Sequence, residues 1–575
     1  MLKRIFSYMK QYKKYAYLAL VCIGIEVVLE LMVPMLMADL IDYGVAGADI
    51  PYIYTKGIQM GGCAILALIL GIGSSKFSAL AGQGLGANIR MAEYEKLQSY
   101  SFSNIDHFRV SSLVTRLTSD VTNIQNSVST GMRPFGRSPV MLIVATSVAF
   151  SINSTLALVF LVALPILAAM LIAIIVHIRP LYTKMQTAID LLNRTVGENL
   201  TAIRVVKAYV RGDYELEKFE EVNDNLKNQS EKAFKSAVLN MPAMQLVMYS
   251  TILGILLLGG HLVKQGELGI GQLTSFLSYV LIILNSLMMM SNVFLMMTRS
   301  LASGARIMEV LDEKIDITDE LARDISVERG EIEFDHVNFK YKEEAEEYVL
   351  SDISFHIEPG QTVGIIGQTG SAKTTLVQLI PRLYDVNEGV VKIDGVDVKE
   401  YPMRHLRDAI AMVLQKNTLF SGSLLSNLKW GNENATMEEI DEACHIACVD
   451  EFIDRLSDGY DTEMGQGGVN VSGGQKQRIC IARAILKKPK VLILDDSTSA
   501  VDTATEAKIR EGLAKKLPDM TKIVIAQRIS SVRHADQIII LDKGRINGIG
   551  THESLLADNR IYQEIYESQK EGAEL

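Results

Sequence analysis

Six long apolar stretches in the first 303 residues restrict most strictly what this chain can fold into. They cover residues 15–36, 57–80, 139–152, 155–178, 241–263 and 273–297. An α-helix needs about 20 apolar residues to cross a bilayer, and most of these stretches reach that length. Because a bilayer offers the backbone no hydrogen-bond partners, each stretch is predicted to be a transmembrane helix.

Positively charged residues around these stretches predict their orientation. They gather before the first stretch, after the fourth and after the sixth, at Lys3, Arg4, Lys10, Lys13, Lys14, Arg179, Lys184, Arg194, Arg204, Lys207, Arg211, Arg299 and Arg306. Basic residues favour the cytoplasmic side, so both termini are predicted to be cytoplasmic in a multi-pass protein of the plasma (inner) membrane. Residues 1–14 lack the features of a cleaved secretory signal and predict a helix at the membrane surface.

The rest of the chain predicts a soluble domain joined to the membrane part by a charged linker. Two polar stretches, residues 86–133 and 179–240, keep helical apolar spacing and predict cytoplasmic extensions of the membrane helices. We place the transmembrane domain at residues 1–311, the linker at 312–329 and an α/β domain at 330–575, where strand and helix patterns alternate. The net charge of −10 argues against a nucleic-acid partner, which would need a basic surface.

A phosphate-binding loop follows the apolar run Val363–Ile366. The loop and the start of the helix that it opens comprise Gly367, Gln368, Thr369, Gly370, Ser371, Ala372, Lys373, Thr374 and Thr375. In such a loop the backbone N–H groups face phosphates, Lys373 can reach the β and γ oxygens, and the Thr374 hydroxyl can ligate magnesium. ATP and Mg²⁺ are therefore the predicted cofactors. Ala372 stands where the pattern has Gly; a helical φ makes its methyl harmless, but a positive φ would cost about 1 kcal/mol.

A second nucleotide element is the apolar strand pattern of residues 491–494, which two acids follow. Asp495, at the strand end, is a predicted magnesium ligand, directly or through water, and Asp496 is the next carboxylate. Two acids after an apolar strand would, alone, usually be a solvated strand end. Together with Lys373 in the same domain they predict a nucleotide site.

The segment that decides the family opens a helix shortly before this strand. It comprises Val471, Ser472, Gly473, Gly474 and Gln475, and it resembles the signature motif of ABC transporters. Its helix start is a second anion-binding element. With six spans before one nucleotide domain, the whole chain resembles a half-transporter of the ABC exporters that move drugs, peptides or lipids. The resemblance implies that two nucleotide domains share each ATP between them.

Other positions match this family and take their roles only from the resemblance. Tyr341 lies where the family stacks an aromatic ring on adenine, and Gln415 lies where a glutamine meets magnesium. The D-loop at the dimer interface is matched by Ser499, Ala500, Val501 and Asp502. Segments near residues 117–125 and 209–216 resemble the two coupling regions that link the membrane helices to the nucleotide domains.

Two positions depart from the family pattern. Asp496 replaces the catalytic Glu, and Gln527 replaces the switch His. Displacing a catalytic carboxylate by about 1 Å can cost roughly a hundredfold in rate, and an amide cannot exchange a proton as His can. Because the binding residues remain, the chain is predicted to hold ATP and to hydrolyse it slowly.

A weakened site beside an intact signature predicts a heterodimer. The signature would complete a competent site on a second half-transporter, which is the predicted partner. Three alternatives stay open: a homodimeric exporter in which Asp496 is sufficient, an ATP-gated regulator or channel, and an importer with the exporter fold. The predicted cargo is a hydrophobic or amphipathic compound, a peptide or a lipid.

Polar residues inside the predicted spans mark a candidate transport path. Glu26 and Glu30 lie one helical turn apart in the first span, where ionisable groups usually face a bundle interior or a watery cavity. They either bind a cationic or polar substrate or form a structural pair, with Lys76 as a possible partner. Candidates in the sixth span are Asn285, Met289 and Asn292.

Overall fold

The computed structural model describes residues 1–497 and 500–571, apart from the side chains of residues 171, 175, 240, 291, 292, 294 and 295. The chain divides into two compact units. Unit 1 comprises Met1–Gln98 and Val110–Glu313, and unit 2 comprises Ser99–Arg109 and Lys314–Leu575. Most of the linker expected at 312–329 therefore belongs to unit 2.

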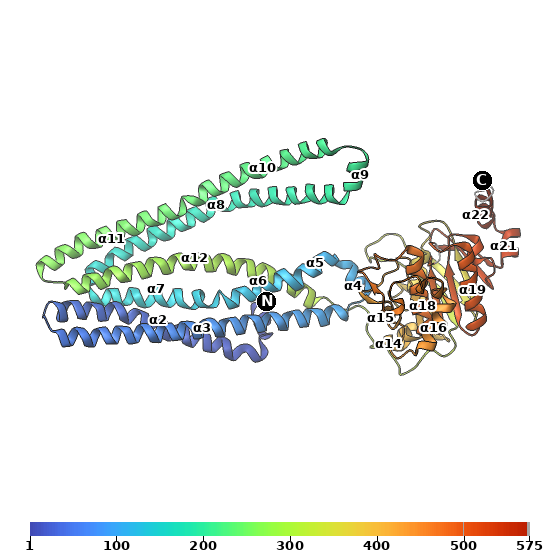
Figure 1. Ribbon diagram of the computed structural model, residues 1–575, viewed down its shortest axis with the longest axis horizontal. Helices are drawn as coiled ribbons and strands as arrows, with labels where there is room; N and C mark the ends of the chain where they lie inside the picture. The colour runs from blue at the N-terminus through green and yellow to red at the C-terminus, as the bar shows by residue number, and fades with distance from the viewer. Residues whose placement is uncertain (498–499, 572–575) are drawn as a thin grey trace. The chain divides into compact units, whose positions relative to one another are not determined.

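Helices make up the regular structure of the described part of unit 1 (Figure 1). In chain order they are α1 (Leu2–Ser7), η1 (Lys10–Tyr12), α2 (Lys13–Asp39), η2 (Leu40–Val45), α3 (Ile50–Gln98), α5 (Val110–Thr115), η3 (Arg116–Asp120), α6 (Val121–Ser129), α7 (Met132–Ile152), α8 (Ser154–Thr201), α9 (Ile203–Ala208), α10 (Gly212–Val238), α11 (Asn240–Gln265) and α12 (Ile270–Asp312). Several are far longer than a bilayer requires, because the polar stretches continue the helices beyond the apolar spans.

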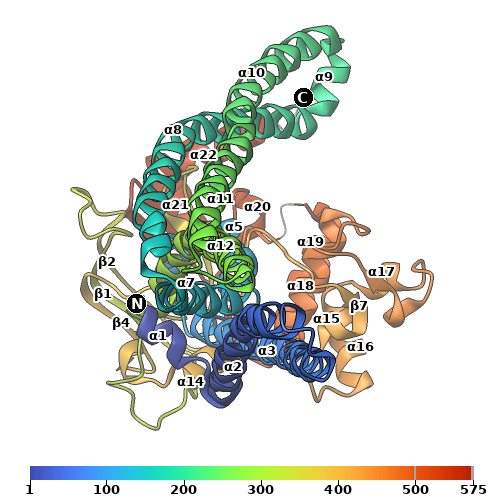
Figure 2. The same cartoon turned by 90° about the vertical axis from the view of Figure 1, so that its left-hand side faces the viewer.

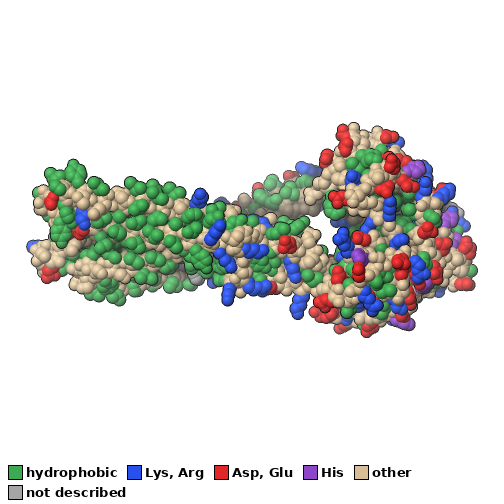
Figure 3. Space-filling view, turned by 90° about the horizontal axis from the view of Figure 1, so that it is seen from below, with side chains coloured by type: hydrophobic (Ala, Val, Ile, Leu, Met, Phe, Trp, Pro, Cys, Tyr) green, Lys and Arg blue, Asp and Glu red, His purple; other side chains and the backbone are tan. Residues whose placement is uncertain are grey.

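Six helical stretches of the described chain are long and apolar enough to cross a membrane. They lie at residues 10–45, 50–98, 110–152, 154–201, 212–265 and 270–290 and overlap the six predicted spans. Within unit 1, Figure 3 shows hydrophobic side chains along these helices and Lys and Arg side chains gathered towards one end. The prediction of a six-helix membrane domain is confirmed.

The core of unit 1 holds α2, α7, α8, α11 and α12 together. Phe160 of α8 stacks on Phe276 of α12 with ring centroids 5.4 Å apart. The buried Tyr279 hydroxyl donates a hydrogen bond of 2.6 Å to the carbonyl oxygen of Leu31. Figures 1 and 2 show α8 running beside α10 and α11, with α9 at the tip of this pair and away from α3, α7 and α12.

Unit 2 is an α/β structure built on two main sheets. Its strands are β1 (Ile332–Phe339), β2 (Leu350–Ile357), β3 (Thr362–Ile366), β4 (Glu388–Ile393), β5 (Val396–Asp397), β6 (Ile410–Val413), β7 (Gly422–Ser423), β8 (Glu463–Met464), β9 (Val491–Asp495), β10 (Thr521–Ile525), β11 (Gln537–Asp542) and β12 (Arg545–Gly550). The larger sheet has the order β12-β11-β3-β10-β9-β6, parallel except for β12, and the smaller antiparallel sheet has the order β2-β1-β4-β5.

Helices surround these sheets in unit 2. They are α4 (Phe102–His107), α13 (Lys373–Gln378), η4 (Val398–Glu400), α14 (Met403–Ala409), α15 (Leu424–Leu428), α16 (Met437–Ile446), α17 (Asp450–Ile453), η5 (Gly459–Asp461), α18 (Gly473–Leu486), α19 (Thr503–Lys516), α20 (Ile529–Val532), α21 (His552–Asp558) and α22 (Arg560–Glu571). Apolar side chains of the parallel strands are buried on both faces of the larger sheet, against α13 on one face and against α18, α20 and α22 on the other. Burial on both faces explains the continuous apolar runs of these strands.

The short helix α4 belongs to unit 2 although it lies early in the chain. The Tyr384 hydroxyl donates a 2.6 Å hydrogen bond to Asp106 Oδ2, and Phe102 packs edge-on against the Tyr384 ring. No motif in the sequence pointed to this segment. Residues 117–125 and 209–216 both lie in unit 1, and their coupling role stays a prediction.

Candidate functional site

Strand order brings three separate sequence motifs to one edge of the larger sheet. Strand β10 lies between β3 and β9, so that Ile525 pairs with Ile365 on one side and with Asp495 on the other. The backbone N–H of Asp496 donates to the carbonyl oxygen of Ile525 at 3.0 Å. The phosphate-binding loop, the two acids and Gln527 therefore all follow the carboxyl ends of neighbouring parallel strands, where ligands bind in such sheets.

The phosphate-binding loop runs from the end of β3 into α13. Lys373 Nζ donates to the carbonyl oxygens of Gly367 and Gln368 at 2.8 and 2.9 Å. A Cβ at Gly367 would lie 2.2 Å from the carbonyl oxygen of Leu541, so this position has room only for glycine. Burial lowers the pKa of Lys373, while Asp496 and Asp495 oppose that shift. The loop thus places the Lys373 ammonium group and its own backbone at the sheet edge.

Ala372 has a left-handed backbone conformation, the strained one of the two alternatives that its sequence position allowed. Its φ is 71° and its ψ is 25°. A methyl group in this region costs about 1 kcal/mol relative to glycine. Alanine in place of glycine at this position therefore strains the backbone of the loop.

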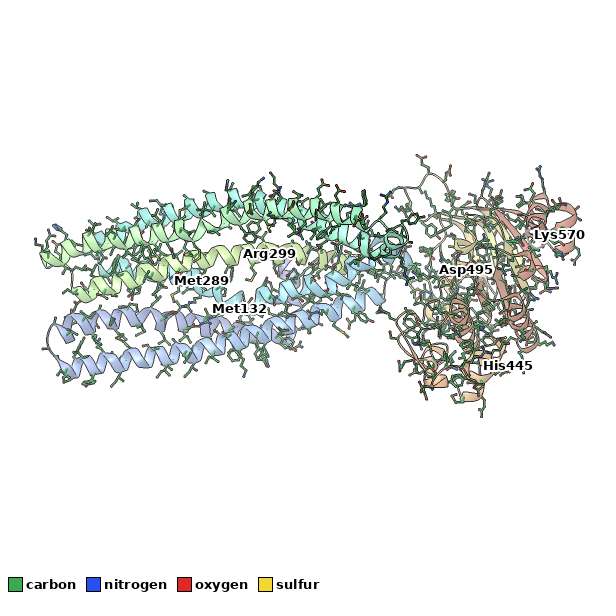
Figure 4. The ribbon with its side chains drawn as sticks, turned by 45° about the horizontal axis from the view of Figure 1, so that its top comes forward. Met132, Met289, Arg299, His445, Asp495 and Lys570 are labelled. Carbon is green, nitrogen blue, oxygen red and sulfur yellow. The ribbon has the colours of Figure 1, made fainter. Side chains whose placement is uncertain are left out.

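Asp495 is buried beside the threonine that begins α13. The carboxylate is 1% exposed, and its Oδ1 accepts a 3.1 Å hydrogen bond from the Thr374 hydroxyl. Its Oδ2 is buried and has no hydrogen-bond partner among the described residues. Burial raises the pKa of Asp495, and the neighbouring Asp496 adds to that rise. An unpaired buried carboxylate oxygen next to a hydroxyl fits the oxygen shell of a magnesium ion; Figure 4 labels Asp495 in unit 2.

Asp496 and Gln527, the two departures from the family pattern, contact each other. Gln527 Nε2 donates a 2.8 Å hydrogen bond to Asp496 Oδ2, and Gln415 Nε2 lies 3.5 Å from the same oxygen. Asp496 has a positive φ of 48°. Gln569 of α22 donates to the Gln527 carbonyl oxygen at 2.7 Å and so helps to hold this loop. No motif in the sequence pointed to Gln569.

Tyr341 follows β1 and presents a half-exposed ring. Its hydroxyl lies 2.9 Å from Thr375 Oγ1, which ties the ring to the phosphate-binding loop. Phe339 and Tyr384 pack edge-on against it with centroids 5.0 and 5.1 Å away. A flat ring held in this way can stack on a nucleotide base. Tyr384 was missed because a single tyrosine after a helix carries no pattern.

The signature segment is a well-formed helix start. Ser472 caps α18: its hydroxyl accepts from the Gln475 backbone N–H at 3.3 Å, and its own N–H donates to Gln475 Oε1 at 2.8 Å. Ser472 and Gly473 are exposed and Val471 is partly buried. This leaves the N-terminus of α18 open to an anion.

The D-loop residues lie against this helix start. A Cβ at Gly474 would come within 2.7 Å of the Ala500 carbonyl oxygen, and the Ala500 N–H donates to Gln477 Oε1 at 3.0 Å. Val501 is buried, and Asp502 caps α19 by accepting from the Thr505 N–H at 2.9 Å. Ser499 lies outside the described residues.

Comparison with known proteins identifies the family of this chain. The ABC transporter transmembrane region matches residues 17–287, and the ABC transporter domain matches residues 350–499. The uncharacterized ABC transporter ATP-binding protein YfiB of Bacillus subtilis (strain 168) is 38% identical over the full length of both chains. The chain belongs to the ABC transporter family.

Two further proteins resemble this transporter, one in sequence and one in structure. The ATP-dependent lipid A-core flippase of Desulfotalea psychrophila (strain LSv54 / DSM 12343) is 34% identical over 85% of each chain. The structure of a bacterial Atm1-family ABC exporter with ATP bound has the same fold, with a TM-score of 0.82 at 24% identity over 97% of this chain and 99% of that one. The protein is therefore a multi-pass ATP-hydrolysing transporter with the exporter fold.

The transporter's candidate path residues fall into two groups. Glu26 is buried and Glu30 half-buried, and both form ion pairs with α7, through Arg133 and Arg137 rather than through Lys76. Asn285 and Met289 lie on an exposed face of α12, and neither lines the cavity beside Glu26 and Glu30 (Figure 4 labels Met289). The side chain of Asn292 lies outside the described residues.

Proposed function

We propose that this transporter is one half of a heterodimeric ABC exporter whose own ATP site hydrolyses slowly. The partner would be a second half-transporter with the Glu and His that this chain lacks. This chain would bind ATP through its phosphate-binding loop and lend its signature segment to the partner's site. The predicted location is the plasma (inner) membrane, with unit 2 in the cytoplasm.

The contact between Asp496 and Gln527 carries the proposal. The Asp496 side chain is one methylene shorter than that of the family's Glu. Its Oδ2 accepts a hydrogen bond from the Gln527 amide. An amide donor on that oxygen occupies a lone pair that a water would use, and the amide cannot take up a proton. Both departures therefore act on water attack and leave nucleotide binding intact.

The residues for binding ATP and magnesium fit their proposed roles. Thr374, Asp495 and Gln415 would hold the ion, which neutralises charge on the phosphates when bound. Lys373 and the loop backbone would hold the phosphates, and Tyr341 would stack on the base. The capped start of α18, at residues 471–475, would serve the partner's nucleotide.

Export of an amphipathic compound, peptide or lipid is the cargo class that we propose. The exporter fold and a relative named as a lipid A-core flippase support this class. Closure of two nucleotide domains around ATP would be coupled to a change in the membrane helices.

Steady-state ATP turnover tests the proposal. The chain would be purified alone and after co-expression with a candidate partner, in lipid at saturating Mg-ATP. We expect turnover well below about 1 per second for the chain alone, and turnover in the ordinary enzyme range with the partner. With the partner, turnover should survive Asp496→Asn in this chain.

Restoring the family residues provides the matched variant. In the chain alone, Asp496→Glu combined with Gln527→His is expected to raise turnover by about a hundredfold. Wild-type turnover of about 1 to 10 per second without a partner would instead establish a homodimer in which Asp496 is sufficient. An ion current that persists with a non-hydrolysable ATP analogue would establish a channel.

A further inference from the structure

Four charged side chains form a neutral cluster between α2 and α7 in the membrane part. Arg133 pairs with Glu26 at 2.5 Å, and Arg137 pairs with Glu30 at 2.5 Å and with Glu26 at 3.4 Å. Both acids and both bases are spaced by four residues, so each pair lies on one face of its helix. We call Glu26, Glu30, Arg133 and Arg137 the charge quartet.

The quartet leaves hydrogen-bonding capacity unused in a buried position. Glu26 is 4% exposed, and its Oε2 has no hydrogen-bond partner among the described residues. The same holds for Glu30 Oε2 and for Arg133 Nε. Buried polar atoms in native proteins are nearly always satisfied, so two free acceptors and one free donor at one place call for a polar ligand or water.

A cavity of about 680 Å³ is lined by the three residues that carry these unpaired atoms. One wall is polar and consists of the charge quartet and Ser75. The rest is apolar and comprises Val33, Pro34, Ala64, Ala67, Leu68, Gly71 and Ile72. Gly71 keeps the cavity close to the charges, because a Cβ there would lie 3.2 Å from an Arg133 guanidinium nitrogen and 3.3 Å from Glu26 Oε1. A ligand with a polar end and an alkyl chain matches both walls.

Charge balance selects the kind of polar end. The quartet holds two negative and two positive charges, so a bound cation or anion would leave one uncompensated charge in a low-dielectric region, which is costly. A zwitterion leaves the site neutral. Its ammonium N–H groups can donate to the free oxygens of Glu26 and Glu30, and its acid group can accept from Arg133 Nε.

We propose that this cavity binds the zwitterionic head group of an amphiphile that carries both an ammonium and a phosphate or similar acid group. The proposal rests on the proposed export function and names the class of cargo for it. It narrows the earlier expectation that Glu26 and Glu30 either bind a cationic or polar substrate or form a structural pair. The competing explanation is that the quartet only clamps α2 to α7.

Equilibrium binding to the full-length chain in uncharged detergent tests the proposal without ATP. Native mass spectrometry would compare lysophospholipids of one chain length: phosphatidylethanolamine, phosphatidylcholine and phosphatidylglycerol types, together with an alkylammonium and free phosphoethanolamine. We expect the ethanolamine lipid to bind about tenfold more tightly than the choline lipid, which has no ammonium N–H donors. The anionic and cationic amphiphiles should bind more weakly still, and so should phosphoethanolamine without a chain.

Single charge removals separate recognition from clamping. Glu30→Gln leaves the quartet with one net positive charge and should move the preference to the phosphatidylglycerol type, whereas Arg133→Gln should move it to the alkylammonium. Lys76→Gln is the matched control, because it removes an exposed charge beside Ser75 and should leave the preference unchanged. A clamp alone would lower the melting temperature in both quartet variants without reversing the preference.

Three results would overturn the proposal. They are equal binding of all head groups, tightest binding of the alkylammonium to the wild type, and an unchanged preference in both quartet variants. Because the measurement uses no nucleotide, it can fail while the turnover experiment succeeds, or succeed while the heterodimer proposal fails.

Discussion

At Ala372 the backbone of the phosphate-binding loop has a φ of 71°, which strains any side chain. Ala372→Gly should therefore stabilise unit 2 by about 1 kcal/mol, less the entropy that glycine adds to the unfolded state. Thermal unfolding of the full chain measures this. Ala514→Gly, at an exposed position inside α19, is the matched control and should lower stability by about 1 kcal/mol. A loss of stability in both variants would contradict the strain argument.

Asp495 combines a buried carboxylate with an unpaired oxygen, and this has a cost without a bound cation. Its pKa is raised by burial, so the ionised form destabilises the fold above that raised pKa, and the cost disappears as pH falls below the ordinary pKa of an aspartate. Near neutral pH, Asp495→Asn should therefore increase the free energy of unfolding of the nucleotide-free chain by about 1 kcal/mol, and its melting temperature should rise.

The same substitution should abolish the added stabilisation by Mg-ATP, because the amide is a poor ligand for magnesium. Melting curves across pH, with and without Mg-ATP, measure both effects. The wild-type curve should approach that of the variant as pH falls. A variant that is less stable at every pH and still responds to Mg-ATP would be incompatible with this role of Asp495.

At the scale of elements, the start of α18 and the D-loop are fitted to each other through Gly474. Gly474→Ala would place a methyl group about 2.7 Å from the Ala500 carbonyl oxygen, and the backbone must then shift. Since a displacement of about 1 Å can cost roughly a hundredfold, ATP turnover of the complex with a partner should fall by about tenfold to a hundredfold. ATP binding by the chain alone should be unchanged, because the phosphate-binding loop is untouched. Loss of that binding would indicate a folding defect instead.

On the scale of the whole molecule, α9 and the two residues that follow it, at the tip of the α8–α10 pair, present exposed apolar side chains. Val205, Tyr209 and Val210 are 57%, 76% and 87% exposed. Exposed apolar groups gathered at one place mark a contact surface, so a second chain is expected to cover this tip. Trypsin should cut rapidly at the exposed bonds after Arg204 and Lys207 in the chain alone and slowly in the assembled transporter, as gel analysis of the fragments would show.

The exposed Lys570 near the end of α22 offers an internal reference for that digestion. The ratio of cleavage at α9 to cleavage at Lys570 removes differences in protease activity between samples. An equal ratio with and without the partner would mean that assembly leaves the tip uncovered.

Short sequence patterns predicted those parts of this protein whose structure depends only on interactions within one short segment. A run of apolar residues specifies a membrane helix wherever it occurs, because the cost of unsatisfied backbone groups in a bilayer belongs to that segment alone. The same is true of the phosphate-binding loop, which needs only a strand, a tight turn and a helix start in succession. Fold class, six spans and the family were therefore readable from the residues.

Tertiary structure alone decided which distant side chains meet. Asp496 contacts Gln527 because β10 is inserted between β3 and β9, and Glu26 meets Arg133 because α2 packs against α7. The sequence suggested Lys76 as a partner of Glu26 and Glu30, but their ion pairs are formed with Arg133 and Arg137. Such pairings depend on strand order and helix packing, which are set by the burial of the whole core, so no short stretch of sequence contains them. The same reason explains why the φ of Ala372 became known only with the fold.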